Sequence, residues 1–141
     1  CILILSLFGC TSARVPTYLY NKHPYVRRFS VPFDTARKEA IQALEELGWE
    51  IRNVTEPSVY EQEAAADDVM QVLIMTEVRK TSMFFGTRYA KVDMYIRSIE
   101  NISEVEIRYF TVTSVLFSSF RTYRNDNAVD RIFRKIQELL P

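Results

Sequence analysis

The chain has 141 residues, enough for one domain with its own core and too few for two comfortable ones. Eighteen Lys and Arg balance eighteen Asp and Glu, so no overall field favours nucleic acid, an anionic membrane or an acidic substrate. The 48% hydrophobic fraction, with three Gly and five Pro, is typical of a globular chain. Both cysteines, Cys1 and Cys10, precede the body of the domain, so no disulfide can staple it.

An uncharged run occupies residues 2–9 and ends at Cys10, after which the sequence turns polar. The run is too short to cross a bilayer, which requires about 20 apolar residues. It is typical of the end of the hydrophobic part of a signal peptide. The alternative interpretations are a buried N-terminal strand and a disulfide between Cys1 and Cys10.

The residues Leu7-Phe8-Gly9-Cys10 resemble the lipobox of bacterial lipoproteins, in which a small residue precedes the modified cysteine. The resemblance implies that residues 1–9 are a signal-peptide remnant. It also implies that Cys10 carries acyl chains such as palmitate, which hold a protein on a bilayer at about 0.8 kcal/mol per buried methylene. Thr11 is similar to the residue at this position in lipoproteins sorted to the outer membrane, facing the periplasm. Residues 10–25 have no clear periodicity and are predicted to be the lipidated cysteine and a tether.

Residues 26–141 are predicted to form a single α+β domain, which begins with a strand over 26–31. A helix follows, capped by Asp34 and ended by Gly48. Its apolar face consists of Ala40, Ile41, Leu44 and Leu47. The next strand is predicted over residues 49–55.

Alternating side chains predict a hairpin from residues 89–97 and 104–111, which turns at Glu100-Asn101. Folding the two segments about this turn matches apolar with apolar residues on one face and opposite charges on the other. That register pairs Val92 with Tyr109, Met94 with Ile107, Ile96 with Val105, Asp93 with Arg108 and Arg97 with Glu104. The hairpin therefore has a defined inner and outer face.

A third strand is predicted over residues 69–84, joined to this hairpin by a three-residue loop centred on Gly86. This loop length sets Val78 against Met94 and Arg79 against Asp93. Three long antiparallel strands result.

The last helix is predicted to be capped near Asn125 to Asn127. Its apolar stripe consists of Val129, Ile132, Phe133, Ile136, Leu139 and Leu140. The predicted fold is an antiparallel β-sheet of about five strands with two helices packed on one face, in the order β-α-β-β-β-β-α. The other face, with its charged rows, is predicted to lie in water.

Catalytic patterns are weak in this sequence. His23 is the only histidine and lies in the predicted tether, without the partners that a zinc site or a serine triad requires. The carboxylates of residues 61–63 and of Asp67-Asp68 lack the ligand alternation of a calcium loop. Three glycines are too few for a phosphate loop or a dinucleotide fingerprint. We therefore expect no enzyme activity, no cofactor and no metal.

Two segments, 83–89 and 117–124, combine aromatic and basic residues. Such surfaces bind single-stranded nucleic acid by stacking or serve as hot spots for proteins, and the neutral net charge favours a protein. The candidate partner-binding residues are Phe85, Arg88, Arg121 and Tyr123. The alternative is that Phe84, Phe117 and Phe120 seal the edge of the core.

The anchor, tether and helix-on-sheet domain together resemble the helix-grip domains of the lipoprotein subunit of the β-barrel assembly machinery. The resemblance concerns architecture and rests on no diagnostic motif. It implies a non-enzymatic scaffold or accessory subunit of a cell-envelope complex, with an envelope protein as its partner. The alternative is a lipoprotein module that binds a small apolar ligand between helices and sheet.

Overall fold

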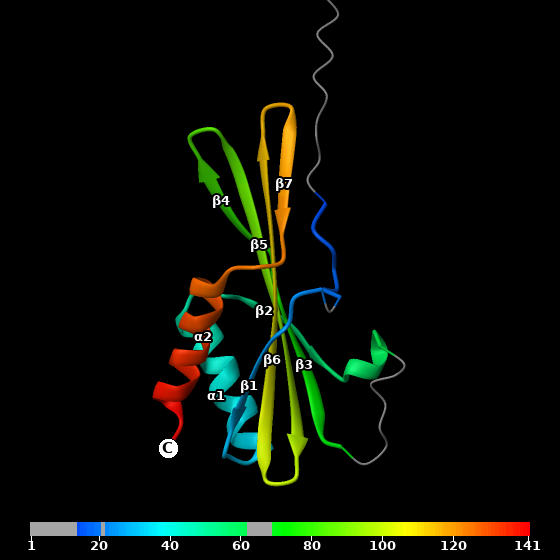
Figure 1. The fold of residues 1–141 in the computed structure, drawn as a ribbon, viewed down its shortest axis with the longest axis vertical. Helices are drawn as coiled ribbons and strands as arrows, with labels where there is room; N and C mark the ends of the chain where they lie inside the picture. Colours follow the sequence, from blue (N-terminus) through cyan, green and yellow to red (C-terminus); the bar gives the residue numbers. More distant parts are fainter. Residues whose placement is uncertain (1–13, 21, 62–68) are drawn as a thin grey trace, which may run out of the picture.

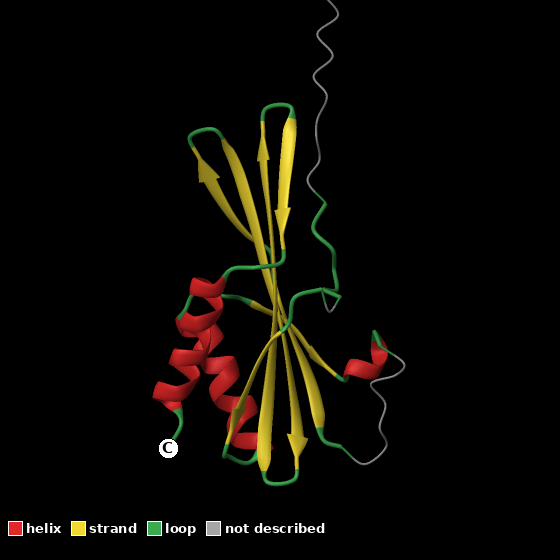
Figure 2. Ribbon diagram, viewed as in Figure 1, coloured by secondary structure: helices red, strands yellow, loops and turns green. Residues whose placement is uncertain are grey.

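The computed structural model describes residues 14–20, 22–61 and 69–141. The described chain is α+β, with seven strands in one antiparallel sheet and two α-helices (Figures 1 and 2). Its elements in order are β1 (Tyr25–Phe29), α1 (Phe33–Glu46), β2 (Ile51–Thr55), the 3-10 helix η1 (Pro57–Val59), β3 (Gln71–Thr76), β4 (Arg79–Met83), β5 (Gly86–Ile99), β6 (Ile102–Val115), β7 (Ser118–Thr122) and α2 (Asp126–Leu139).

The 14-residue strands β5 and β6 form the spine of the sheet and extend through both of its halves. One half has the order β1-β6-β5-β3-β2. The other half has β4 on β5 and β7 on β6, and it projects away from the two helices (Figure 1). We call the second half the double-hairpin end; it comprises β4, β7, the segments 86–90 and 111–115, and the two turns. The predicted count of about five strands was too low because the predicted strand over 69–84 is divided into β3 and β4, and because residues 118–122 form the additional strand β7.

The helices cover one face of the first half and bury the main core. Leu44 of α1 and Ile136 of α2 are fully buried there, together with Met94 and Ile107 of the spine. Burial of each such side chain contributes about 1.5–3 kcal/mol to folding. The amphipathic patterns of the two helices therefore fold as predicted, onto one face of the sheet.

The helix ends follow the sequence signals with one exception. Gly48, with φ of 83°, ends α1 in the left-handed conformation that favours glycine. The Asn125 side chain caps α2 by accepting a hydrogen bond from the Ala128 backbone N at 3.0 Å. The predicted cap by Asp34 is wrong, because the first helical bond runs from Ala36 N to Pro32 O. Asp34 lies instead in the first turn, where its charge favours the helix dipole.

The register of β5 and β6 is the predicted one. All five predicted pairs are confirmed, and the two-residue turn lies at Glu100-Asn101. The Glu100 backbone takes up the positive φ of 55° that this tight turn needs.

The predicted continuous strand over 69–84 is wrong. β3 and β4 are separate strands, and Arg79 lies opposite Ala90 instead of Asp93. The interruption occurs after Thr76, whose hydroxyl is 2.9 Å from the Val92 carbonyl oxygen and 3.0 Å from the Val92 amide nitrogen. The next amide, of Glu77, turns to the carbonyl oxygen of Glu50 at 2.8 Å. The chain then resumes pairing with β5 one residue out of register, as in a β-bulge.

The second face of the sheet is not in water, contrary to the expectation. The described part of the predicted tether packs across it, with Tyr18 and Leu19 buried. As a result the rows of charged side chains on β5 and β6 become an interior layer, with Lys91 and Asp93 at 0% exposure.

Candidate functional site

The double-hairpin end is built from two hairpins that share the spine. The turn Phe84-Phe85 joins β4 to β5, with Met83 opposite Gly86, and the turn Leu116-Phe117 joins β6 to β7. Gly86 was predicted to supply a permissive turn conformation, but its φ is not positive and it begins β5. Its role is close approach, because a Cβ at this position would lie 1.9 Å from the Ser114 carbonyl oxygen.

Large apolar side chains at these turns face solvent. Phe84 is 95% exposed, Phe85 72%, Leu116 82% and Phe117 96%. Phe84 and Phe85 contact each other edge to face, with ring centroids 4.8 Å apart. The alternative that Phe84, Phe117 and Phe120 seal the core edge is therefore wrong, because all three lie on the part of the sheet that projects beyond the helices.

The charge of this end is entirely positive. Its exposed cations include Lys80, Arg88 and Arg121. Arg79, at the root of β4, places its guanidinium 3.8 Å from the Trp49 ring centroid and donates to the Leu47 carbonyl oxygen at 2.9 Å. Burial lowers the pKa of Arg79, but the cation–π contact with Trp49 compensates part of this cost.

The four candidate partner-binding residues occupy three surfaces of the double-hairpin end. Phe85 is at a turn, and Arg88 shares its face with Ala90 on the side of the helices. Arg121 lies opposite Val112 on the other face. Tyr123 packs edge to face on Phe110 at 5.1 Å. The sequence reasoning thus found the right end of the molecule, although these residues do not form one patch.

The sequence reasoning missed Leu116, and it assigned Phe84 and Phe117 to the core edge. A signal for them was present: both two-residue turns consist of large apolar residues where Gly, Asn and Asp are usual. Phe117 also has a φ of 74°, a conformation that bulky residues rarely adopt.

A second polar feature lies on the face that residues 14–19 cover. Lys91 Nζ is 3.3 Å from Asp93 Oδ1, and it donates to the Thr17 carbonyl oxygen. Asp93 Oδ2 accepts from the Leu19 backbone N at 2.9 Å. Burial raises the pKa of Asp93, opposed by the charge of Lys91, and burial likewise lowers the pKa of Lys91.

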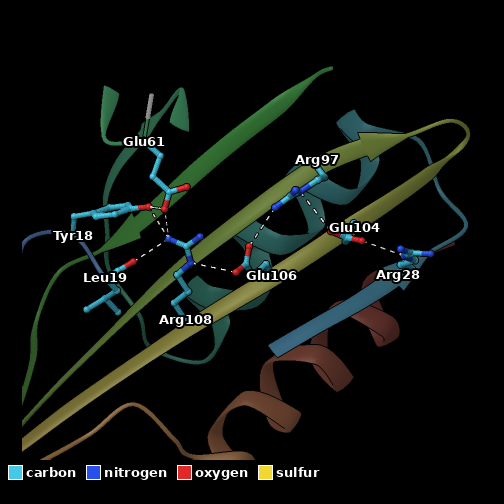
Figure 3. Close-up of polar contacts among 8 residues, drawn as sticks. All are labelled: Tyr18, Leu19, Arg28, Glu61, Arg97, Glu104, Glu106 and Arg108. Carbon is cyan, nitrogen blue, oxygen red and sulfur yellow. Dashed lines mark hydrogen bonds and ion pairs between the residues drawn. The ribbon is translucent and has the colours of Figure 1, made fainter. Parts of the chain in front are cut away.

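Arg108 is the centre of the neighbouring ionic network (Figure 3). Its guanidinium donates to the Tyr18 hydroxyl at 2.6 Å, to the Leu19 carbonyl oxygen at 3.0 Å and to Glu61 at 2.7 Å. Glu106 accepts from it at 3.3 Å. Burial alone would lower the pKa of Arg108, but the bond to Glu61 and the charge of Glu106 raise it.

The network continues across the sheet as alternating charges. Arg97 pairs with Glu106 at 3.3 Å and with Glu104 at 3.4 Å, and Arg28 of β1 closes the row on Glu104 at 3.1 Å. Each charge meets an opposite one, so the arrangement fixes residues 14–19 and the end of η1 on the sheet. It is a structural clamp that holds these segments against the sheet.

Within the described residues, no group of three His, Cys, Asp or Glu side chains could hold a metal ion. His23 packs against Tyr25, with ring centroids 5.1 Å apart. Cys10, Cys1 and the carboxylates Glu63 and Asp67-Asp68 lie outside the residues that the structure describes.

Neither α1 nor α2, the two α-helices of the described residues, could span a bilayer. In comparisons with known proteins, no family model matches the chain and no curated protein matches its sequence.

Proposed function

We propose that this chain is a lipoprotein of the bacterial cell envelope, anchored through acylated Cys10, and that it acts as a non-enzymatic scaffold or accessory subunit of an envelope complex. The double-hairpin end is the observation that carries the proposal. It projects beyond the helices and displays aromatic and basic side chains, and of its residues only Ala90 belongs to the buried main core. Such a surface is typical of a contact site for a partner.

The outer strands of this end also favour a protein partner. β4 pairs with β5 and β7 with β6, so each has an outer edge without a strand among the described residues. An extended segment of a partner can add to such an edge through backbone hydrogen bonds. Arg88 and Arg121 lie on opposite faces of the same end, where they would select the partner by charge.

The alternative, a module for a small apolar ligand, has less support. The layer between helices and sheet is filled by buried side chains such as Leu44, Met94 and Ile136. A hollow of about 380 Å³ between β1 and α2 is large enough for a ligand, but the charged Arg27, Asp126 and Asp130 line it together with apolar residues such as Val129 and Phe133.

Two measurements test the proposal. Mass spectrometry of the membrane fraction should find an N-terminus at Cys10 that carries acyl chains, and Cys10→Ala should abolish the membrane attachment that resists a high-salt wash. A photo-crosslinker at position 121 of β7 should capture one defined envelope protein in cells, whereas a crosslinker at the exposed Glu138 of α2 should not. Chains that still begin before Cys10, or equal capture from both positions, would contradict it.

A further inference from the structure

The two turns of the double-hairpin end carry exposed apolar side chains at one extremity of the molecule. All four turn residues are Phe or Leu, and the least exposed of them, Phe85, is still 72% exposed. Both turns lie at the same end of the sheet, away from the C-terminus (Figure 1). These four residues contribute nothing to the fold's own core, and exposed apolar side chains grouped at one extremity are typical of a contact site.

The charge around these turns is unlike that of the rest of the chain. The double-hairpin end carries four Lys and Arg, namely Arg79, Lys80, Arg88 and Arg121, and no Asp or Glu. Since the whole chain is neutral, the remaining residues carry four more carboxylates than cations. The protein is therefore polarised, and the basic side surrounds the aromatic turns.

We propose that the double-hairpin end contacts the anionic surface of a phospholipid bilayer, with Phe84, Phe85, Leu116 and Phe117 inserted at the interface. Aromatic rings favour the headgroup level of a membrane, and Lys80, Arg88 and Arg121 would lie beside lipid phosphates. Insertion stops at the turns, because the unpaired backbone edges of β4 and β7 cannot enter hydrocarbon.

The shape of the two turns, unlike that of the strand edges behind them, favours a bilayer over a protein as their occupant. A stable protein interface needs about 800 Å² on each partner, as one continuous complementary patch. Here the apolar residues form two narrow turns, and the faces behind them carry polar residues such as Thr81, Ser114 and Ser119. Two points that dip into a flat, fluid surface need no such continuity.

The length of chain between Val15 and Cys10 is enough for the proposed anchor to reach the same surface, and this step rests on the proposed function. Val15 packs on the cluster of Leu19, Phe110 and Val112 at the root of the end. Five residue steps separate it from Cys10, and they span at most about 18 Å. Val112 lies five steps before Phe117, about 16 Å along an extended strand. One membrane plane can thus hold both the acyl chains and the turns.

The experiment measures co-flotation of the full chain as Cys10→Ser, which removes the acyl anchor, with vesicles of phosphatidylglycerol and phosphatidylethanolamine. We expect the Cys10→Ser chain to bind these vesicles. The additional substitutions Phe84→Ser and Phe117→Ser, made together, should weaken this binding by at least about tenfold. The control, Val59→Ser with Met70→Ser, changes two residues of 66% and 55% exposure away from the turns and should leave binding within about twofold. Removal of Arg88 or Arg121 should weaken binding about fivefold each, and vesicles of phosphatidylcholine should bind less than the anionic ones.

The outcomes separate this inference from the proposed function. The proposed bilayer contact is wrong if the Cys10→Ser chain does not bind anionic vesicles. It is also wrong if the control variant (Val59→Ser with Met70→Ser) loses as much binding as the turn variant (Phe84→Ser with Phe117→Ser). In that case capture of an envelope protein by position 121 of the acylated chain would leave the proposed function standing. A photo-crosslinker at Phe117 that captures lipid in cells supports the inference, and one that captures only protein overturns it.

Discussion

Two regions of the sheet differ in which side chains they bury. One is the face that residues 14–19 cover, and the other is the double-hairpin end. On the covered face, Lys91 and Asp93 are completely buried. At the double-hairpin end, Phe84 and Phe117 are almost completely exposed. Both regions lie on the same two strands, β5 and β6. The contrast shows that polarity along a strand does not determine burial; burial depends on which segment covers the strand.

The largest effect should come from breaking the buried ion pair. Lys91→Met leaves Asp93 as an unpaired buried carboxylate and should lower the free energy of unfolding by about 3–5 kcal/mol. The double variant Lys91→Met with Asp93→Leu should recover most of this loss, because it removes both charges. Urea unfolding of the three proteins measures the difference. If the double variant is no more stable than Lys91→Met, then the loss of stability does not come from an unpaired buried charge on Asp93.

A second comparison tests the cover itself. Leu19→Ala removes a fully buried side chain and should cost about 2–5 kcal/mol, whereas Phe84→Ala should change stability by no more than about 0.5 kcal/mol. Phe84, although larger than Leu19, should therefore contribute less to the free energy of unfolding. Equal losses in thermal or chemical unfolding would mean that the double-hairpin end belongs to the folding core after all.

Alkaline pH should weaken the covered face. Burial, together with the charge of Glu61, raises the pKa of Tyr95 to about 12. The folded chain therefore retains this proton longer than the unfolded one, and stability falls as pH rises from about 10 toward 12. The loss should reach about 2–3 kcal/mol. Tyr95→Phe should flatten this part of the stability profile, and an unchanged slope would exclude Tyr95 as its source.

The smallest effect concerns the strained turn. Phe117→Gly should raise the free energy of unfolding by about 1 kcal/mol, because glycine adopts the φ of 74° without strain. The same change should weaken vesicle binding, since it removes an exposed ring. Leu116→Gly is the control for the loss of an exposed side chain at the same turn. A gain in vesicle binding by Phe117→Gly would contradict the insertion of the Phe117 ring into the bilayer.

Much of the candidate site was visible in the sequence, but its grouping was not. The aromatic-basic composition of 83–89 and 117–124 marked the correct end of the molecule. The two segments are far apart in sequence, and they become neighbours because β4 and β7 pair with opposite edges of one hairpin. The distribution of Arg88 and Arg121 over two faces also follows from this pairing.

The sequence by itself determined the register of β5 and β6 and the identity of both helices. Each of these depends on local periodicity, and in the hairpin two faces had to agree at once. Only the tertiary structure decided the bulge after Thr76 and the burial of Lys91 and Asp93. The bulge depends on hydrogen bonds to Val92 and Glu50, and the burial depends on residues 14–19, which are about 75 positions away in the chain. Contacts between such distant segments leave no periodic trace in either one, and so the alternating charges of β5 correctly predicted a strand but incorrectly predicted its exposure to water.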